Sequence, residues 1–295
     1  MIPKLKIEQM IRIHQLALLI IIMICSCQKI EEFGSYITTN FFNEGIPIDG
    51  VTQLIESDLT CINENCAEIE VNYPIFKSQK LLNQRIESII IKEIEGFIPI
   101  PNNANTISDY MELFIKSYNV FKIQFPESKT PWFLEINVET IYNRSGWLSF
   151  AYRSKSYTGG VRINEWLKYI NIDTLGRSID IEKKIGDFNE LRKQAEIIFR
   201  EQNNLAPDIQ ISATGYTFKN NIFHLPENIG INDTDILLYY NNYEIGDNIQ
   251  GAMLIKIPHQ SATNIFEFPY YQDIINYYKK ILSWWSDQNK VPQQY

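Results

Sequence analysis

Histidine is scarce in this sequence, and its scarcity limits the chemistry that the chain can perform. Only three of the 295 residues are histidines. The two that lie beyond the first twenty residues, His224 and His259, belong to no His-x-x-x-His or His-Glu-x-x-His pattern. A zinc hydrolase uses such a pattern to supply its metal ligands. We therefore expect no metal site, and we interpret both histidines as structural.

Other catalytic motifs are missing as well. The sequence contains no Gly-x-Ser-x-Gly elbow, no phosphate-binding loop and no Gly-x-Gly-x-x-Gly fingerprint, so we expect no cofactor and single out no catalytic residue. Carboxylates are plentiful, however, and Glu135, Glu139 and Asp173 lie on the polar faces of predicted strands. Two carboxyl groups about 5 to 9 Å apart would suit a glycoside hydrolase. A carboxylate-dependent glycan hydrolase of the cell envelope is therefore the alternative to a non-catalytic protein.

The chain also lacks an excess of positive charge. Lysine and arginine total 27 against 35 aspartates and glutamates, which gives a net charge of −8. Nucleic-acid binding needs a basic surface, so we expect no nucleic-acid partner. An acidic surface attracts cationic partners and also favours solubility.

An apolar run near the N-terminus is too short to cross a membrane. It extends over nine residues, 16–24, and follows the basic residues Lys4, Lys6 and Arg12. A helix that spans a bilayer needs roughly 20 apolar residues. We therefore interpret residues 1–26 as a signal peptide.

The end of that run resembles the lipobox of bacterial lipoproteins. It consists of Ile24-Cys25-Ser26-Cys27, and Ser26 before Cys27 fits the pattern better than Ile24 before Cys25. The resemblance implies a lipid on Cys27 and an outer-membrane lipoprotein that faces the periplasm or the cell surface. The following Gln28-Lys29-Ile30-Glu31-Glu32 is similar to the export tag of Bacteroidetes surface lipoproteins, although a plain polar tether is equally compatible with it.

Two further cysteines, Cys61 and Cys66, remain in the predicted mature chain. An oxidising compartment permits a disulfide between them, and free thiols are the other interpretation. A metal pair would need two more ligands, which are not found nearby.

Periodicity predicts an α+β fold. After a lipidated tether and irregular lead-in at 27–60, an alternating strand at 66–73 precedes two amphipathic helices. The full set is helices at 78–95, 108–121, 187–199 and 271–285, with strands at 66–73, 131–142, 147–152, 164–173, 216–225, 235–240 and 252–257. Helices and strands do not alternate regularly, so we expect an antiparallel sheet with helices packed mainly on one face. Residues 61–155 and 156–295 are expected to form two portions of one compact unit.

Two motifs resemble a family of bacterial extracytoplasmic domains of unknown function. The first is Tyr157-Thr158-Gly159-Gly160, followed by a strand at 169–173 and a turn at 175–177; the second is the segment 238–246. The family includes the lysozyme-binding ectodomain of the RsiV anti-sigma factor and the non-catalytic N-terminal region of the PdaC deacetylase. The resemblance covers roughly residues 65–265. Val161-Arg162 stand where the family has Ala-His.

The resemblance implies a module that binds a ligand outside the cell, here as a stand-alone lipoprotein. A lysozyme-like protein, or peptidoglycan and other glycans, are the ligands that it implies. Exposed Tyr, Trp and Arg dominate binding hot spots. The binding candidates around the double glycine are therefore Tyr157, Gly159, Gly160, Arg162 and Trp166.

Overall fold

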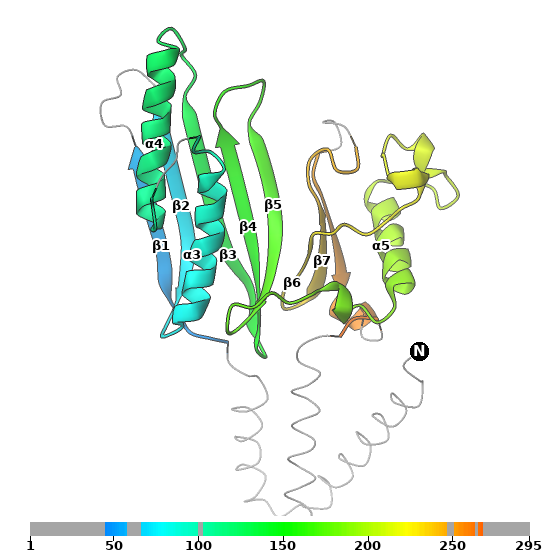
Figure 1. The fold of residues 1–295 in the computed structure, drawn as a ribbon. Helices are drawn as coiled ribbons and strands as arrows, with labels where there is room; N and C mark the ends of the chain where they lie inside the picture. The colour runs from blue at the N-terminus through cyan, green and yellow to red at the C-terminus, as the bar shows by residue number, and fades with distance from the viewer. Residues whose placement is uncertain (1–44, 58–65, 100–102, 247–250, 263–264, 268–295) are drawn as a thin grey trace, which may run out of the picture. The chain divides into compact units, whose positions relative to one another are not determined.

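The structure is a computed structural model that describes residues 45–57, 66–99, 103–246, 251–262 and 265–267. Its first layer is a five-stranded sheet in the order β1-β2-β3-β4-β5 (Figure 1). The strands are β1 (Ile48–Ser57), β2 (Ala67–Phe76), β3 (Trp132–Arg144), β4 (Trp147–Tyr157) and β5 (Asn164–Asp173). Neighbours are antiparallel, except that β2 and β3 are parallel.

The parallel pair results from two helices that connect β2 to β3. These are α3 (Lys80–Glu95) and α4 (Ile107–Gln124). Thr106 caps α4 by accepting a hydrogen bond from the Asp109 backbone, while the Asp109 carboxylate accepts one from the Thr106 backbone. A crossover of two helices returns the chain to the end of the sheet at which β2 began, so β3 runs in the same direction. The α+β class and both helices are confirmed, but the sheet is mixed rather than purely antiparallel.

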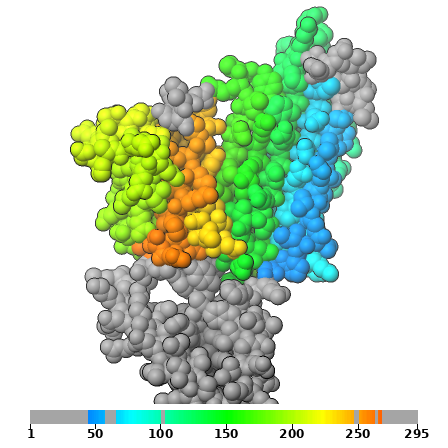
Figure 2. Space-filling model, turned by 180° about the vertical axis from the view of Figure 1, so that it is seen from behind, coloured from blue at the N-terminus to red at the C-terminus, as the bar shows by residue number. Residues whose placement is uncertain are grey.

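Both helices cover one face of this sheet. Alternation along β2 and β3 places Ile69, Val71, Leu134 and Ile136 under the helices, and all four are buried. The residues between them, such as Glu135, point to the opposite face and are exposed. Figure 2 shows the molecule from behind, with β1 and β2 in blue beside the green strands. On β2 and β3, the face without helices is therefore the polar one.

A second sheet of three antiparallel strands, β6-β7-β8, packs against part of that opposite face. Its strands are β6 (Ile229–Ile231), β7 (Asp235–Tyr240) and β8 (Met253–Pro258), flanked by α5 (Phe188–Gln202) and the short α6 (His259–Ala262). One side of β7 joins the core beneath α5, through Ile236 and Leu238. From the other side, Leu237 packs on Ala151 and Tyr169 of the first sheet. The second sheet thus covers β4 and β5.

Two asparagines close the outer edge of β5. The side chain of Asn228 accepts a hydrogen bond from the Tyr169 backbone at 2.7 Å and donates one to the Leu167 carbonyl at 2.8 Å. The side chain of Asn241 accepts from the Leu167 backbone at 2.8 Å and donates to its carbonyl at 3.0 Å. Amide side chains therefore take the place of a sixth strand.

Two segments differ from the sequence prediction. The lead-in was expected to be irregular up to residue 60, but residues 48–57 form β1. The predicted strand at 216–225 is wrong, because this segment is irregular and includes a short 3-10 helix, Lys219–Asn221. Phe218 and Phe223 are nevertheless buried there, against Phe199 of α5. The predicted helix at 271–285 lies outside the described residues.

Candidate binding surface

The loop between β4 and β5 contains the double glycine and can be followed at the top of Figure 1. Gly159 and Gly160 have φ angles of 102° and 128°, which side chains rarely adopt, so glycine is required here as the sequence indicated. The Tyr157 hydroxyl donates a hydrogen bond to the Gly160 carbonyl at 3.1 Å. The aromatic residue before the turn therefore helps to hold the loop in one shape.

The residues that follow the double glycine expose apolar side chains to solvent. Val161 is 98% exposed and Ile163 47% exposed. Between them, the Arg162 guanidinium lies 4.9 Å from the ring centroid of Tyr243, which follows β7 and is 49% exposed. Such a cation–π contact is worth about 0.5–1 kcal/mol at an exposed site. We call these four residues, Val161, Arg162, Ile163 and Tyr243, the tip surface.

Trp166 does not belong to this surface. Its ring stacks on Tyr152 with centroids 5.3 Å apart and an interplanar angle of 20°, and Tyr152 points into the core beneath the helices. The structure therefore brings Tyr157, Gly159, Gly160 and Arg162 together in one loop and places Trp166 on the opposite face of the sheet. The sequence could not distinguish the two faces, because β5 carries apolar residues on both.

Trp166 instead belongs to a polar cluster between α3 and β4. The Glu93 carboxylate accepts a hydrogen bond from the Ser154 hydroxyl at 3.1 Å and another from the Trp166 side chain. Burial raises the pKa of Glu93, and the two hydrogen bonds oppose this effect. The cluster ties the helix layer to the sheet.

The three carboxylates singled out for glycan hydrolysis do not converge. Glu135 and Glu139 lie four residues apart on β3, so their Cα atoms are roughly 13 Å apart in an extended strand. Each forms an ion pair, Glu135 with Lys155 at 3.9 Å and Glu139 with Arg153 at 2.8 Å. Two paired carboxylates at this spacing lack the geometry of a hydrolase pair.

Asp173, the last residue of β5, stabilises the turn that follows the strand. It accepts hydrogen bonds from the Leu175 and Arg177 backbones, each at 2.9 Å, and pairs with the Arg177 side chain at 2.6 Å. These contacts lower the pKa of Asp173 against the opposing effect of its burial. The carboxylate therefore fixes the turn after β5.

The histidines also have structural surroundings. His259 begins α6 and is buried, and this burial lowers its pKa. His224 Nδ1 lies 3.1 Å from the Leu225 carbonyl, and its ring packs edge-on to Phe218. Within the described ranges, no group of three or more His, Cys, Asp or Glu side chains could hold a metal ion.

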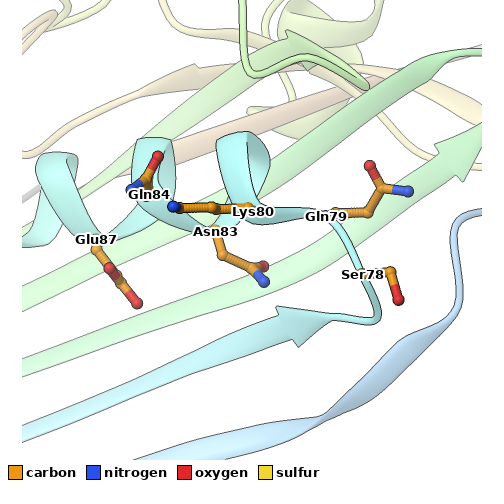
Figure 3. A pocket seen from close by; sticks show the side chains of 6 residues that line it. All are labelled: Ser78, Gln79, Lys80, Asn83, Gln84 and Glu87. Carbon is orange, nitrogen blue, oxygen red and sulfur yellow. The ribbon is translucent and has the colours of Figure 1, made fainter.

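A wide hollow lies beside the first turns of α3 (Figure 3). It is lined by Ser78, Gln79, Lys80, Asn83, Gln84 and Glu87. Asn83 is already engaged, since its side chain exchanges two hydrogen bonds with the Phe76 backbone. In Figure 3, Ser78 and Gln79 lie on the segment before the helix, while Lys80, Gln84 and Glu87 lie along its first turns.

Two regions of the chain match known family models. Residues 61–162 match the family model described as deacetylase PdaC, and residues 180–260 match the model described as a protein of unknown function, DUF3298. The chain thus contains one region similar to the PdaC model, followed by one similar to the DUF3298 model. The resemblance seen in the sequence is confirmed. No curated protein matches the chain.

Solved structures of DUF3298 proteins share this fold. A DUF3298 family member from Bacteroides fragilis is 20% identical, with a TM-score of 0.58 over 76% of this chain and 95% of its own. A DUF3298 family protein from Pseudomonas aeruginosa is 15% identical, with a TM-score of 0.57 over 77% of this chain and 97% of its own. At these identities the comparison concerns the fold alone. The PdaC-type region contains β2 to β4 with their helices, and the DUF3298 region contains α5 and the second sheet.

The predicted N-terminal features lie outside the described residues, including the signal peptide, Cys25, Cys27 and Cys61. Cys66 is disulfide-bonded, and its pairing with Cys61 stays a prediction. No helix in the described part of the chain is long and apolar enough to cross a membrane.

Proposed function

We propose that this chain is a non-catalytic extracytoplasmic binding module, anchored to the membrane through a lipid on Cys27. Its ligand is a lysozyme-like protein or another cell-wall-associated protein or glycan. The observation that carries this proposal is the tip surface, where exposed apolar side chains flank an arginine stacked on a tyrosine.

The composition of the tip surface suits protein recognition. Arginine and tyrosine are enriched at binding hot spots, and valine and isoleucine side chains at Val161 and Ile163 offer apolar area that a partner would remove from water. The loop is also held in shape, by its glycine conformations and by the Tyr157 hydrogen bond. A preordered loop loses less conformational entropy when it binds.

The net charge supports a basic ligand. A chain of charge −8 attracts a cationic protein over the range of the Debye length, about 8 Å at physiological ionic strength. This attraction raises the association rate more than the final affinity. Binding to a basic protein should therefore weaken with salt mainly through slower association.

Glycan hydrolysis by the chain itself has weaker support. The carboxylates that could have formed a catalytic pair are separated along β3 and bound to cations, or are used in the turn after β5. No described observation favours this alternative over binding.

A calorimetric titration of the full chain with hen lysozyme, and separately with soluble peptidoglycan fragments, tests the proposal. Val161→Asp places a charge on the tip surface beside Arg162 and should weaken binding at least tenfold, about 1.4 kcal/mol. Ile123→Asp is the matched control, because Ile123 is an equally simple aliphatic residue, 81% exposed, on α4. Equal loss in both variants, or no saturable heat with either ligand, would contradict the proposal.

A further inference from the structure

The two edge strands of the five-stranded sheet differ in whether their outward-facing backbone groups are hydrogen-bonded. At β5, the side chains of Asn228 and Asn241 hydrogen-bond to the N–H and C=O of Leu167 and to the N–H of Tyr169. At the opposite edge, β1 pairs with β2 and with no other strand in the part of the chain that the structure describes. Since an open strand edge is a template for pairing, β1 is the edge at which another strand can be added.

The hydrogen bonds of β2 reveal which groups of β1 face outward. The Trp132 backbone donates to the Cys66 carbonyl, so even-numbered residues of β2 face β3 and odd-numbered ones face β1. Tyr73 and Val71 lie opposite Thr52 and Leu54. Thr52 and Leu54 therefore bond inward.

The residues that alternate with them, Val51, Gln53 and Ile55, direct both their N–H and C=O groups away from the sheet. These groups form a regular row of donors and acceptors along the outer edge of β1. A strand added at this edge could therefore form ladder hydrogen bonds with each of these groups.

The central part of β1, residues 51–55, carries none of the usual protections of an edge strand. Residues 51–55 are Val-Thr-Gln-Leu-Ile, with no charge and no proline, and the register shift of β1 lies outside them, between Ile48 and Gly50. Val51 is 70% exposed and Ile55 57% exposed. Edge strands of monomeric proteins are commonly protected by lysine, proline or a bulge.

We propose that β1 pairs antiparallel with β1 of a second copy of this chain, around a two-fold axis through Gln53. In this register Gln53 meets Gln53 of the second copy, and Val51 meets Ile55 of the second copy on both sides of the axis. Each of these residue pairs exchanges two backbone hydrogen bonds. The exposed Val51 and Ile55 side chains cover one another, as expected of an isologous contact.

Charge and hydrogen-bond alignment select this register. Asp49 lies opposite Ser57 of the second copy, and Glu56 lies opposite Gly50, so no carboxylates face each other. A shift by one residue, with the axis between Thr52 and Gln53, would set Asp49 against Glu56. It would also place outward-facing groups opposite inward-facing ones, and the ladder would not form.

Cysteine cross-linking of the full chain tests the register. Hydrogen-bonded antiparallel partners have Cα atoms about 5.5 Å apart, within the range that a disulfide spans. Gln53→Cys should therefore form a covalent dimer on mild oxidation, above the background that the wild-type cysteines give.

The neighbouring substitution is the matched control. In the proposed register the two Val51 Cα atoms are more than about 13 Å apart, so Val51→Cys alone should cross-link roughly tenfold less than Gln53→Cys, because disulfides need Cα atoms within about 7 Å. Combining it with Ile55→Cys should restore the covalent dimer. Equal cross-linking of Gln53→Cys and Val51→Cys would overturn the proposal.

A proline substitution tests the contact without cross-linking. Because the Gln53 N–H faces outward, Gln53→Pro removes a backbone hydrogen bond to the second copy and no backbone hydrogen bond to β2. The Gln53 side chain also donates a hydrogen bond to Glu70 of β2 at 2.9 Å, and Gln53→Thr removes that bond as well, so it is the matched control. In sedimentation analysis the wild type and Gln53→Thr should be dimers, while Gln53→Pro should be a monomer with an unchanged unfolding transition. A monomeric wild type at about 100 μM, roughly a hundred times the concentration at which a micromolar dimer dissociates by half, would overturn the proposal.

Discussion

Glu93 of α3 accepts a hydrogen bond from the Ser154 hydroxyl of β4 at 3.1 Å. This contact joins the helix layer to the sheet at a point where the rest of the interface is apolar. Burial raises the pKa of the Glu93 carboxyl, which makes the contact sensitive to pH.

The sign of this sensitivity follows from linkage. A carboxyl group with a raised pKa in the folded state binds its proton more tightly there, so its contribution favours folding at low pH. That contribution is lost as the pH rises from about 4.5, the ordinary value, through the folded-state pKa. Glu93→Gln should therefore be more stable than the wild type near pH 8, as judged by urea unfolding, and the difference should shrink toward pH 4.

Glu95→Gln, at an exposed position on the same helix, is the control for Glu93→Gln. Its effect on the free energy of unfolding should be small at both pH values. A Glu93→Gln variant that is less stable than the wild type near pH 8 would show that the ionised carboxylate stabilises the fold.

Two buried tyrosines offer a test of hydrogen bonding in the core. The Tyr152 hydroxyl has no hydrogen-bond partner among the described residues, whereas the Tyr240 hydroxyl donates to the His224 carbonyl. Tyr152→Phe should therefore leave the free energy of unfolding unchanged or slightly higher. Tyr240→Phe should lower it by about 1–2 kcal/mol, because a buried carbonyl loses its donor. Parallel chemical denaturation measures both, and the reverse order of stability would contradict this description of the core.

Asn228→Ala tests the closed edge of β5. The substitution removes the acceptor for the Tyr169 backbone and a donor to the Leu167 carbonyl, and we expect a loss of about 1–3 kcal/mol. Amide hydrogen exchange at Tyr169 should accelerate. Asn137→Ala, on the exposed face of β3, should change neither quantity; similar behaviour of the two variants would count against the edge-closing role.

The contact between the sheets is tight at Gly230. A Cβ atom added there would lie 2.5 Å from Cγ of Tyr169. Gly230→Ala should therefore lower the free energy of unfolding by about 1–3 kcal/mol, as expected for overpacking. At Gly186 the nearest atom to an added Cβ is the Ile265 carbonyl oxygen at 3.8 Å, so Gly186→Ala should be tolerated. Equal stability of the two variants in thermal unfolding would contradict close packing at Gly230.

The elements that could be predicted from the sequence are those with a local signal. Helices α3 and α4 each bury one stripe, and β3 buries every second residue, so periodicity identifies them. Strand β1 was not predicted because polar and apolar residue types do not alternate along it, although burial does: Val51 and Ile55 lie on its exposed face, and Thr52 and Glu56 on its half-buried face. At 216–225, burial of Phe218 and Phe223 produced a strand-like composition in an irregular backbone.

Only the local features of the candidate site could be predicted from the sequence, and its long-range contacts could not. The double glycine requires positive φ angles, which is a local property. The contact between Arg162 and Tyr243, and the capping of Leu167 by Asn241 across 74 positions of sequence, depend on how the second sheet docks. No local pattern encodes that docking. The sequence grouped Trp166 with the loop residues because β5 carries apolar side chains on both faces, and its pattern does not show which face Trp166 occupies.

The central claim is that the chain binds its ligand with the tip surface, and hydrogen exchange of the full chain with and without saturating hen lysozyme tests it most directly. The account predicts slower exchange at residues 158–163 and 241–246, with little change at Glu70 and Glu135 on the polar face of the first sheet. Protection centred on Glu70 and Glu135, with unchanged exchange in both loops, would contradict it.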